Sequence, residues 1–497
     1  MIAAEMSAHL FLLGLAGYSA VLMLISLKAA RRQNSGEDFL LAGRQVSSGL
    51  TFGTTIATMI GTGTSMGAVG YAYLHGWSGV MYGIGGAVGI LLTAWLFAPV
   101  RALRFMTMSE EVSYYAGASS KVKQLTALII FLASLGWLAA HILGGALYLA
   151  WATGISLFAA KWILASAFTL FVLAGGYRAV VWTDSLMAIV LFAGFIVLAV
   201  FVLHDAGGVN SIVDYADTAI QLGQLTTPGA IPALSLAIAV AVGVLAAPSF
   251  RQRIYSGASV SSIRKAFGLA AVVYLLFALV PAMLGIAASQ LLPDLDIHQH
   301  AFTGLITLLL PPMLAVLVML AGISATLSSA SSDAIAAVSV LIRDGYCAVF
   351  GQMPAPDKAV LYSRLAVLVV SVLALLLALF ADDIIRFITS MIATLMSGLC
   401  VCCIAGRCWR RLNAYGVVFA ILGASVTSVL VLLNSSWLEF WGNPVIPALS
   451  AGFIFAVVVS LLTPVNRFSR QQALQMITTE REQQQGTPVP EASVTQN

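Results

Sequence analysis

The sequence predicts an all-α, polytopic membrane protein with about thirteen transmembrane helices, and two observations lead to that fold class. Of its 497 residues, 60% are hydrophobic and only 9% are charged, whereas soluble domains carry about 25% charged residues. The apolar residues form long continuous runs of the roughly 20 residues that a transmembrane helix needs, unlike the short alternating segments of a membrane β-barrel. The spans are therefore expected to be helices.

The predicted spans follow one another with short loops between them. The first run has no small-residue cleavage site and keeps the polar Ser19 and Ser26, so we interpret it as a retained span and not as a signal peptide. After Pro464 the chain is rich in Gln, Thr and Pro, and we expect a disordered tail there. The predicted spans are 8–28, 46–73, 78–103, 122–152, 156–176, 179–204, 231–249, 263–291, 311–342, 359–381, 384–406, 412–434 and 444–463.

The charges of the loops predict the orientation. With the N-terminus outside, nearly all Lys and Arg residues fall in cytoplasmic loops, and only Lys161 and Arg386 fall elsewhere. We expect a multi-pass protein of the inner or plasma membrane with a cytoplasmic C-terminus, whose net charge of +4 reflects inner loops near anionic lipid and not a nucleic-acid partner. Typical inner-loop residues are Arg31, Arg32, Arg101 and Arg104, and typical outer-loop residues are Asp214, Asp217, Asp294 and Asp296.

Several function classes find no support in the sequence. It contains neither a G-x-x-x-x-G-K-[ST] phosphate-binding loop nor an HExxH pair, so we expect no ATP hydrolysis, no catalytic residue and no enzyme. The cysteines have no neighbouring His and lie at the inner ends of spans, which favours small packing residues over a metal site or a disulfide framework. They are Cys347, Cys400, Cys402, Cys403 and Cys408.

Two acids, Asp184 and Asp333, lie well within predicted spans. A charged side chain at that depth costs at least about 2.5 kcal/mol, so each carboxylate needs a partner, a water-filled cavity or a cation. The structural alternatives are an Asp184 hydrogen-bonded to hydroxyls near the inner membrane face and an Asp333 that reaches inner-side water.

The ninth span carries four serines within five positions. At 3.6 residues per turn, the stripe of Ser328, Ser331 and Ser332 shares a face with Ser329 and with the carbonyl of Ala325 one turn earlier. The pattern is compatible with a small-residue packing face. Together with Asp333 on the same helix, it favours coordination of a monovalent cation by neutral oxygens, and sodium is the natural candidate.

Two spans are interrupted. Glycines and threonines weaken the second span over 57–65, and the seventh span repeats this theme from Gly243 to Pro248. Broken helices five spans apart are typical of a transporter with an inverted five-plus-five repeat and a midplane site. The predicted organisation is an extra helix and first loop over 1–45, repeats over 46–204 and 205–406, two further helices over 407–463 and the tail over 464–497.

A solute pocket is expected beside the breaks. Trp137 and His141 are one turn apart on the fourth span, although such a pair also fits core packing. No Lys or Arg is expected deep in the pocket, and small carboxylates or amino acids could use the N-termini of broken helices. The candidate solute contacts are Gly61, Thr62, Thr64, Ser65, Trp137, His141 and Ser249.

Three stretches resemble the sodium/solute symporter family: DFLLAGRQV (38–46), GGYRAVVWTDSLMA (175–188) and SATLSSASSDAIAAVSVLIRDGY (324–346). The resemblance covers nearly the whole chain. It implies the leucine-transporter fold and sodium-coupled uptake of a small organic solute by alternating access, with one or two Na⁺ ions, and we expect a monomer. It implies a first sodium site at Ala57, Ile60, Ala325, Ser328 and Ser329, and a possible second one at Asp184, Ser331 and Ser332.

The sequence departs from the family pattern at Asp333, Met187 and Met59, where the family usually has an uncharged residue, a glutamine and, in some members, an acid. Three alternatives therefore stay open. Asp184 or Asp333 could carry protons in a proton-coupled symporter, or the domain could be a solute sensor. A membrane-embedded enzyme is the third, but His141 has no acid or Cys predicted beside it.

Overall fold

The computed structural model describes residues 8–30, 36–212, 229–381 and 383–484, and within these ranges it is built from helices without a β-strand. Arg31, Arg32, Asp214 and Asp217, which contributed to the predicted orientation, lie outside the described residues. The helices of the first half are α1 (Ala8–Ala30), α2 (Gly36–Leu41), α3 (Ser48–Met59), α4 (Val69–His75), α5 (Val80–Phe97), α6 (Met108–Tyr115), α7 (Ser120–Thr153) and α8 (Leu157–Asp205). Those of the second half are α10 (Ala230–Ala246), α11 (Pro248–Ser256), α12 (Val260–Phe277), α13 (Leu279–Leu291), α14 (Ala301–Leu309), α15 (Pro312–Val340), α16 (Cys347–Phe350), α17 (Pro356–Leu379), α18 (Ile384–Met391), α19 (Ser397–Cys408), α20 (Ala414–Leu433), α21 (Ser435–Trp441), α22 (Val445–Leu462) and α23 (Arg470–Gln484).

Ten helical stretches of the described chain are long and apolar enough to cross a membrane, and the bent pair α10 and α11 gives an eleventh. Two of the ten are long and are interrupted by a glycine with positive φ. The 49 residues of α8 would extend about 73 Å, against a hydrocarbon core of about 30 Å, and Gly176 (φ 54°, ψ −164°) interrupts them. The 41-residue stretch over 63–103 is broken at Gly76 (φ 56°). Counted as two crossings each, these stretches bring the number to the predicted thirteen.

Both predicted helix breaks are present. The first separates α3 from a π-helical turn at Gly63–Ala68 that leads into α4. The second lies at the extended residue Ala247, where α10 and α11 meet at 43°. Pro248 begins α11, a position that a proline tolerates because the first helical residue needs no backbone N–H. The division of the chain into two inverted repeats stays a prediction.

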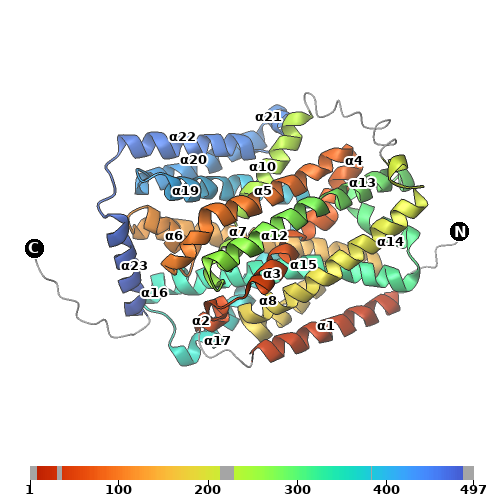
Figure 1. Cartoon of the computed structure of the whole chain (residues 1–497), viewed down its shortest axis with the longest axis horizontal. Coiled ribbons are helices and arrows are strands. Elements are labelled where there is room, and N and C mark those ends of the chain that lie inside the picture. Colours follow the sequence, from red (N-terminus) through yellow and green to blue (C-terminus); the bar gives the residue numbers. More distant parts are fainter. Residues whose placement is uncertain (1–7, 31–35, 213–228, 382, 485–497) are drawn as a thin grey trace, which may run out of the picture.

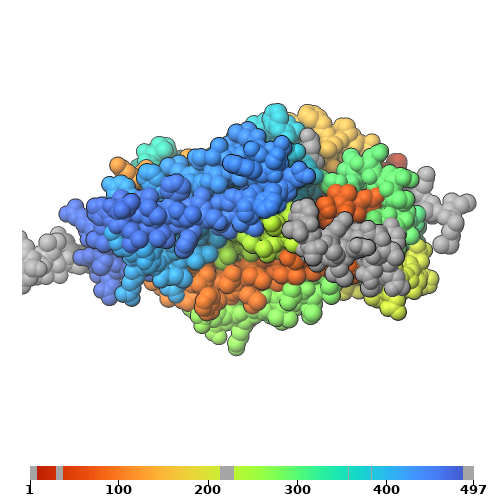
Figure 2. Space-filling model, turned by 90° about the horizontal axis from the view of Figure 1, so that it is seen from above, coloured from red at the N-terminus to blue at the C-terminus, as the bar shows by residue number. Residues whose placement is uncertain are grey.

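The long helices run side by side along the longest axis of the molecule, with α15 inside the bundle and α1, α20 and α22 at its edges (Figure 1). Every residue of α15 from Val318 to Val340 is buried. The C-terminal helices α20 and α22 extend along one face (Figure 2), where exposed side chains such as Phe419, Leu430 and Phe453 suit contact with lipid. The serine-rich stretch is therefore turned inward and not toward lipid.

The expectation of a disordered tail over 464–497 is wrong for its first part, because α23 covers Arg470–Gln484. This polar helix buries Ala473 and Ile477, one turn apart, against the bundle. Arg481 also pairs with the buried Glu110 at 3.0 Å. The tail sequence has no apolar period of its own, so the helix is stabilised by these tertiary contacts and not by its composition. The residues after 484 lie outside the described chain.

Candidate functional site

The end of α3 meets the serine-rich middle of α15. The last four carbonyls of a helix have no partner within that helix. Ser328 Oγ donates to the Ala57 carbonyl at 3.0 Å, and Ser329 Oγ donates to the Thr58 carbonyl at 3.0 Å. The Ala325 carbonyl lies 3.2 Å from Ser329 Oγ and 3.4 Å from Ser328 Oγ. Two backbone carbonyls and two hydroxyls of the predicted sodium site are therefore neighbours.

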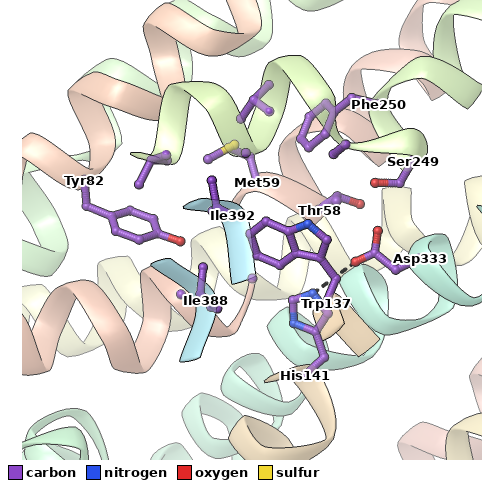
Figure 3. Close-up of a pocket in the computed structure, with 16 residues that line it drawn as sticks. Thr58, Met59, Tyr82, Trp137, His141, Ser249, Phe250, Asp333, Ile388 and Ile392 are labelled. Atoms are coloured by element: carbon purple, nitrogen blue, oxygen red, sulfur yellow. Dashed lines mark ion pairs between the residues drawn. The ribbon is translucent and has the colours of Figure 1, made fainter. Parts of the chain in front are cut away.

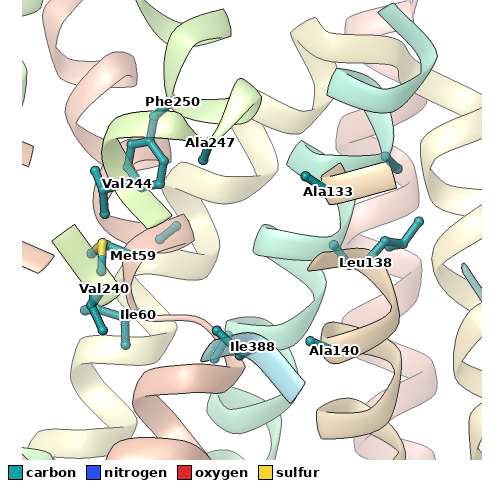
Figure 4. Packing of buried hydrophobic residues seen from close by; sticks show 14 of the residues in the cluster. Met59, Ile60, Ala133, Leu138, Ala140, Val240, Val244, Ala247, Phe250 and Ile388 are labelled. Atoms are coloured by element: carbon teal, nitrogen blue, oxygen red, sulfur yellow. The ribbon is translucent and has the colours of Figure 1, made fainter. Parts of the chain in front are cut away.

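The fifth predicted ligand, Ile60, stands in the break itself. It is the first residue after α3 and has a non-helical backbone (φ −85°, ψ 54°). Gly61 follows, and a Cβ there would lie 2.5 Å from Ser329 Oγ, so only glycine lets α15 approach this closely. The broken end of α3 packs against α10, where Met59 and Ile60 lie beside Val240 and Val244 (Figure 4).

Asp184 of α8 lies in a polar cluster that also holds a buried guanidinium. Its Oδ2 accepts hydrogen bonds from Thr54 Oγ1 at 2.6 Å and Ser332 Oγ at 3.1 Å, and it lies 3.6 Å from Arg253 Nη2. The same nitrogen lies 2.8 Å from Ser332 Oγ, 2.9 Å from Thr54 Oγ1 and 3.1 Å from the Thr54 carbonyl, and it also contacts Thr58 Oγ1. A terminal guanidinium nitrogen carries only two hydrogens, so Arg253 Nη2 has more oxygen acceptors within reach than it can donate to.

The residues implied for a second ion are not equally placed in this cluster. Ser332 Oγ donates to Asp184 at 3.1 Å, whereas Ser331 Oγ donates to the Ser328 carbonyl of its own helix at 3.0 Å and interacts with the Asp184 carboxylate as a weaker neighbour. Arg253 was missed at this site because it counts as an inner-loop charge in the sequence. The signal that could have found it was Asp184, a buried carboxylate in need of a partner.

A cavity of about 50 Å³ lies at the two helix breaks (Figure 3). Of the predicted solute contacts, Gly61, Trp137, His141 and Ser249 line it. Thr62, Thr64 and Ser65 are buried but do not line it. Most of the remaining lining is apolar: Met59, Gly63, Val240, Gly243, Val244, Ala247, Phe250, Ile388 and Ile392, with Thr58, Tyr82 and Asp333 as polar members.

The expectation that His141 has no acid beside it is wrong. Its Nε2 lies 3.3 Å from Asp333 Oδ2, and its Nδ1 lies 3.0 Å from Thr62 Oγ1. The ring also stacks with Trp137, at a centroid distance of 6.1 Å and an interplanar angle of 16°. The close approach of Thr62 requires Gly144 on α7, where a Cβ would lie 2.0 Å from Thr62 Cγ2. The acid was missed because it comes from α15, far away in the sequence.

Within the described residues, no group of three or more His, Cys, Asp or Glu side chains is placed to hold a metal ion. The five cysteines are free, and four of them are buried, while Cys408 is exposed.

A model of the sodium:solute symporter family matches residues 39–424. The chain belongs to this family. It is 25% identical over 459 residues to the sodium/pantothenate symporter of Escherichia coli strain K12, covering 88% of this chain and 93% of that protein. It is also 25% identical over 479 residues to the sodium/proline symporter of Haemophilus influenzae, covering 89% and 92%. The solved structure of a Na⁺-coupled sialic acid symporter in a substrate-bound outward-open state matches with a TM-score of 0.78 at 19% identity, covering 92% of this chain and 98% of that one.

This symporter therefore has the leucine-transporter-like fold that the resemblance implied. Its predicted family, its multi-pass membrane location, its function in sodium-coupled solute uptake and sodium as the transported ion are confirmed. The ligands of the ions and the residues that contact the solute stay predictions, as do the orientation of the termini and the oligomeric state.

Proposed function

We propose that one sodium ion binds where α3 meets α15, held by the carbonyls of Ala57, Ile60 and Ala325 and by the hydroxyls of Ser328 and Ser329. The contacts of the two serines with α3 carry this proposal. Their oxygens lie 3.0 to 3.4 Å from the carbonyls. A cation with ligands at about 2.4 Å in octahedral geometry separates neighbouring ligands by about 3.4 Å, so small shifts convert these contacts into an ion site.

Coupling follows from the way in which the two sites share one segment. Ala57 and Ile60 belong to the proposed sodium site, and their neighbours Thr58 and Gly61 line the cavity. An ion that orders this segment also orders the cavity wall, so sodium and solute each favour binding of the other. Inward movement of the ion contributes about 2.3 kcal/mol per 100 mV of membrane potential, in addition to its concentration gradient.

The cluster of Asp184, Ser331 and Ser332 is the second proposed site, and Arg253 controls it. The guanidinium and a sodium ion would compete for the same oxygens, because Arg253 Nη2 lies within hydrogen-bond distance of Ser332 Oγ and Thr54 Oγ1. A second ion therefore requires displacement of Arg253. We propose one sodium ion per cycle as long as the arginine stays in place.

The protein acts as a monomer in the inner or plasma membrane, with its N-terminus outside, and it releases the solute chemically unchanged. The orientation is supported by basic side chains that gather at the end of the bundle where α6 and α23 lie, since Arg343 and Arg481 pair with the same carboxylate of Glu110. The solutes that name the two relatives, pantothenate and proline, support a small organic solute.

The test is sodium-dependent thermal stability of the purified protein, with NaCl exchanged for KCl at constant ionic strength. Ser328→Ala and Ser329→Ala should each raise the sodium concentration for half-maximal stabilisation about tenfold, equivalent to about 1.4 kcal/mol. Ser371→Ala on α17 is the matched control, because among the described residues its hydroxyl bonds only the Val367 carbonyl of its own helix, at 2.7 Å.

Compounds that stabilise the protein in sodium are then tested for uptake into proteoliposomes with sodium or proton gradients imposed separately. Unchanged sodium dependence in both serine variants would remove the site assignment. Accumulation driven by the proton gradient alone would favour the proton-coupled alternative.

A further inference from the structure

We propose that the central cavity recognises a cationic nitrogen of the solute through Asp333, and that a hydrogen-bond acceptor of the same solute is bound by the indole N–H of Trp137. The inference rests on the proposed transport function, because it assigns the solute class to that cavity. It concerns a position at which this chain departs from the family pattern.

The charge of the cavity lining is one-sided. Asp333 and His141 supply the carboxylate and the imidazole among its lining residues, and no Lys or Arg of the described chain is found there. Both side chains are deeply buried, with exposed fractions of 3% for Asp333 and 4% for His141. The sign of the charge in the cavity therefore depends on the protonation of this pair.

The hydrogen bonds around His141 favour the neutral imidazole. Thr62 is fully buried, and its hydroxyl has no other hydrogen-bond partner among the described residues than His141 Nδ1. A buried hydroxyl proton without an acceptor is costly, so the hydroxyl donates to Nδ1. Nδ1 is then an acceptor and the ring proton lies on Nε2, which faces the Asp333 carboxylate at 3.3 Å. The pair then carries one negative charge.

That charge is only partly compensated. His141 is the single partner of the Asp333 carboxylate within the described chain, although a buried carboxylate can accept several hydrogen bonds. One carboxylate oxygen of Asp333 contacts His141, and the other oxygen points away from the imidazole ring, toward Thr58 and Ser249 (Figure 3). A buried carboxylate requires more than one neutral donor, so the cavity favours a ligand that brings a positive charge to this oxygen.

A second polar group in the cavity wall is also without a partner. Trp137 Nε1 is buried and forms no hydrogen bond with the described residues. A ligand oxygen that accepts this N–H would satisfy it, and the indole face offers a favourable surface to a neighbouring cation. The fitting solute is thus a small molecule with a protonated or quaternary nitrogen and an acceptor oxygen, on an otherwise apolar body. An anion without a cationic nitrogen would face the Asp333 carboxylate uncompensated.

Thermal stability in NaCl with a panel of small amines, amino acids, carboxylates and polyols tests the assignment. The panel contains matched triplets such as 3-aminopropanol, 3-hydroxypropionate and 1,3-propanediol, which differ mainly in charge. We expect the stabilising compounds to carry a cationic nitrogen and to lose at least tenfold in affinity in Asp333→Asn. Trp137→Phe keeps the ring without its N–H, and it should lose several-fold in affinity for compounds with an acceptor oxygen. The exposed Glu439→Gln is the charge-matched control, in which affinities should stay unchanged.

Retained sodium stabilisation in Asp333→Asn shows that this variant is folded. Stabilisation by carboxylates or polyols that lack a cationic nitrogen, equal affinity for cations in Asp333→Asn, or a panel in which no cation stabilises the protein would each overturn the assignment. Failure of the proposed sodium coupling has a different signature, because cationic compounds would then bind equally well in NaCl and KCl.

Discussion

Replacing Arg253 with alanine tests whether a fixed guanidinium occupies the position of a second cation. The Arg253 side chain is 1% exposed and Asp184 is fully buried. Removing one partner of such a buried pair costs about 3–5 kcal/mol, because it leaves the other charge uncompensated. In KCl we therefore expect Arg253→Ala to be strongly destabilised.

Sodium should reverse part of this loss. An ion that binds only the folded state stabilises it by about 2.7 kcal/mol at 100 times its Kd. This is more than half of the smallest expected loss of stability in Arg253→Ala, about 3 kcal/mol. The oxygens of Asp184, Thr54 and Ser332 that face Arg253 Nη2 become available to the ion in the variant. The wild-type protein gains stability only from the site at α3 and α15. The melting temperature of Arg253→Ala should thus rise more steeply with sodium concentration than that of the wild type.

The assay follows intrinsic fluorescence during heating, in NaCl and KCl mixtures of constant ionic strength. The double variant Asp184→Asn with Arg253→Ala lacks both charges, and its sodium response should return to the wild-type slope. Equal slopes for Arg253→Ala and the wild type would refute the idea that the guanidinium stands in for an ion.

Three further outcomes are expected. Burial raises the pKa of Glu110, but Arg343 and Arg481 outweigh burial and lower this pKa to about 2. The resulting stabilisation of the folded state, about 3 kcal/mol, is present above pH 4.5 and is lost only as the pH falls toward 2. Helix α23 should therefore resist trypsin equally from about pH 8 to pH 5, and it should become sensitive to trypsin in Glu110→Gln. Gly144→Ala should push Thr62 away from His141 and weaken solute-induced stabilisation at least fivefold, while Gly268→Ala, with open space at its Cβ, leaves it unchanged or improves overall stability by up to about 1 kcal/mol. A membrane-impermeant maleimide should label the exposed Cys408 in inverted vesicles and not in intact cells, and labelling of intact cells would reverse the proposed orientation.

The meeting of α3 with α15 could be predicted because its signals are local. Glycines that weaken a helix are visible in 57–65, and hydroxyls at helical spacing are visible around Ser328. The partners of the two membrane acids could not be predicted in this way. Arg253 follows a proline in a polar stretch and reads as a loop charge, whereas α11 continues as a bent helix that carries the side chain into the bundle.

The pair of His141 and Asp333 was equally inaccessible, because it depends on how α7 and α15 are rotated relative to one another. The order of the C-terminal helix α23 could not be predicted from the sequence either. Its composition predicts disorder, and its order comes from ion pairs with residues of other segments, Lys123 and Glu110. Hydropathy and spacing thus locate broken helices and polar stripes, whereas the pairing of buried charges is a property of the packed structure.

One residue, Thr58, connects the three polar features of the core. Its carbonyl accepts the hydroxyl proton of Ser329, its hydroxyl contacts Arg253, and its side chain lines the cavity. A shift of Thr58 at the end of α3 therefore changes its contacts with Ser329, with Arg253 and with the cavity together. This makes Thr58 the expected route by which occupancy of the sodium site changes affinity for the solute.

Thr58→Val keeps the shape of the side chain and removes its hydroxyl, whereas Thr58→Ser keeps the hydroxyl. Coupling is measured as the ratio of solute Kd values in KCl and NaCl, which linkage requires to equal the effect of solute on sodium affinity. Loss of one hydrogen bond to a charged group is worth about 1.5–3 kcal/mol, so we expect the ratio to fall about tenfold or more in Thr58→Val and to be largely retained in Thr58→Ser. If both variants kept the wild-type ratio, the coupling would have to pass through Gly61 or through α15 alone, and the hydroxyl of Thr58 would have no part in it.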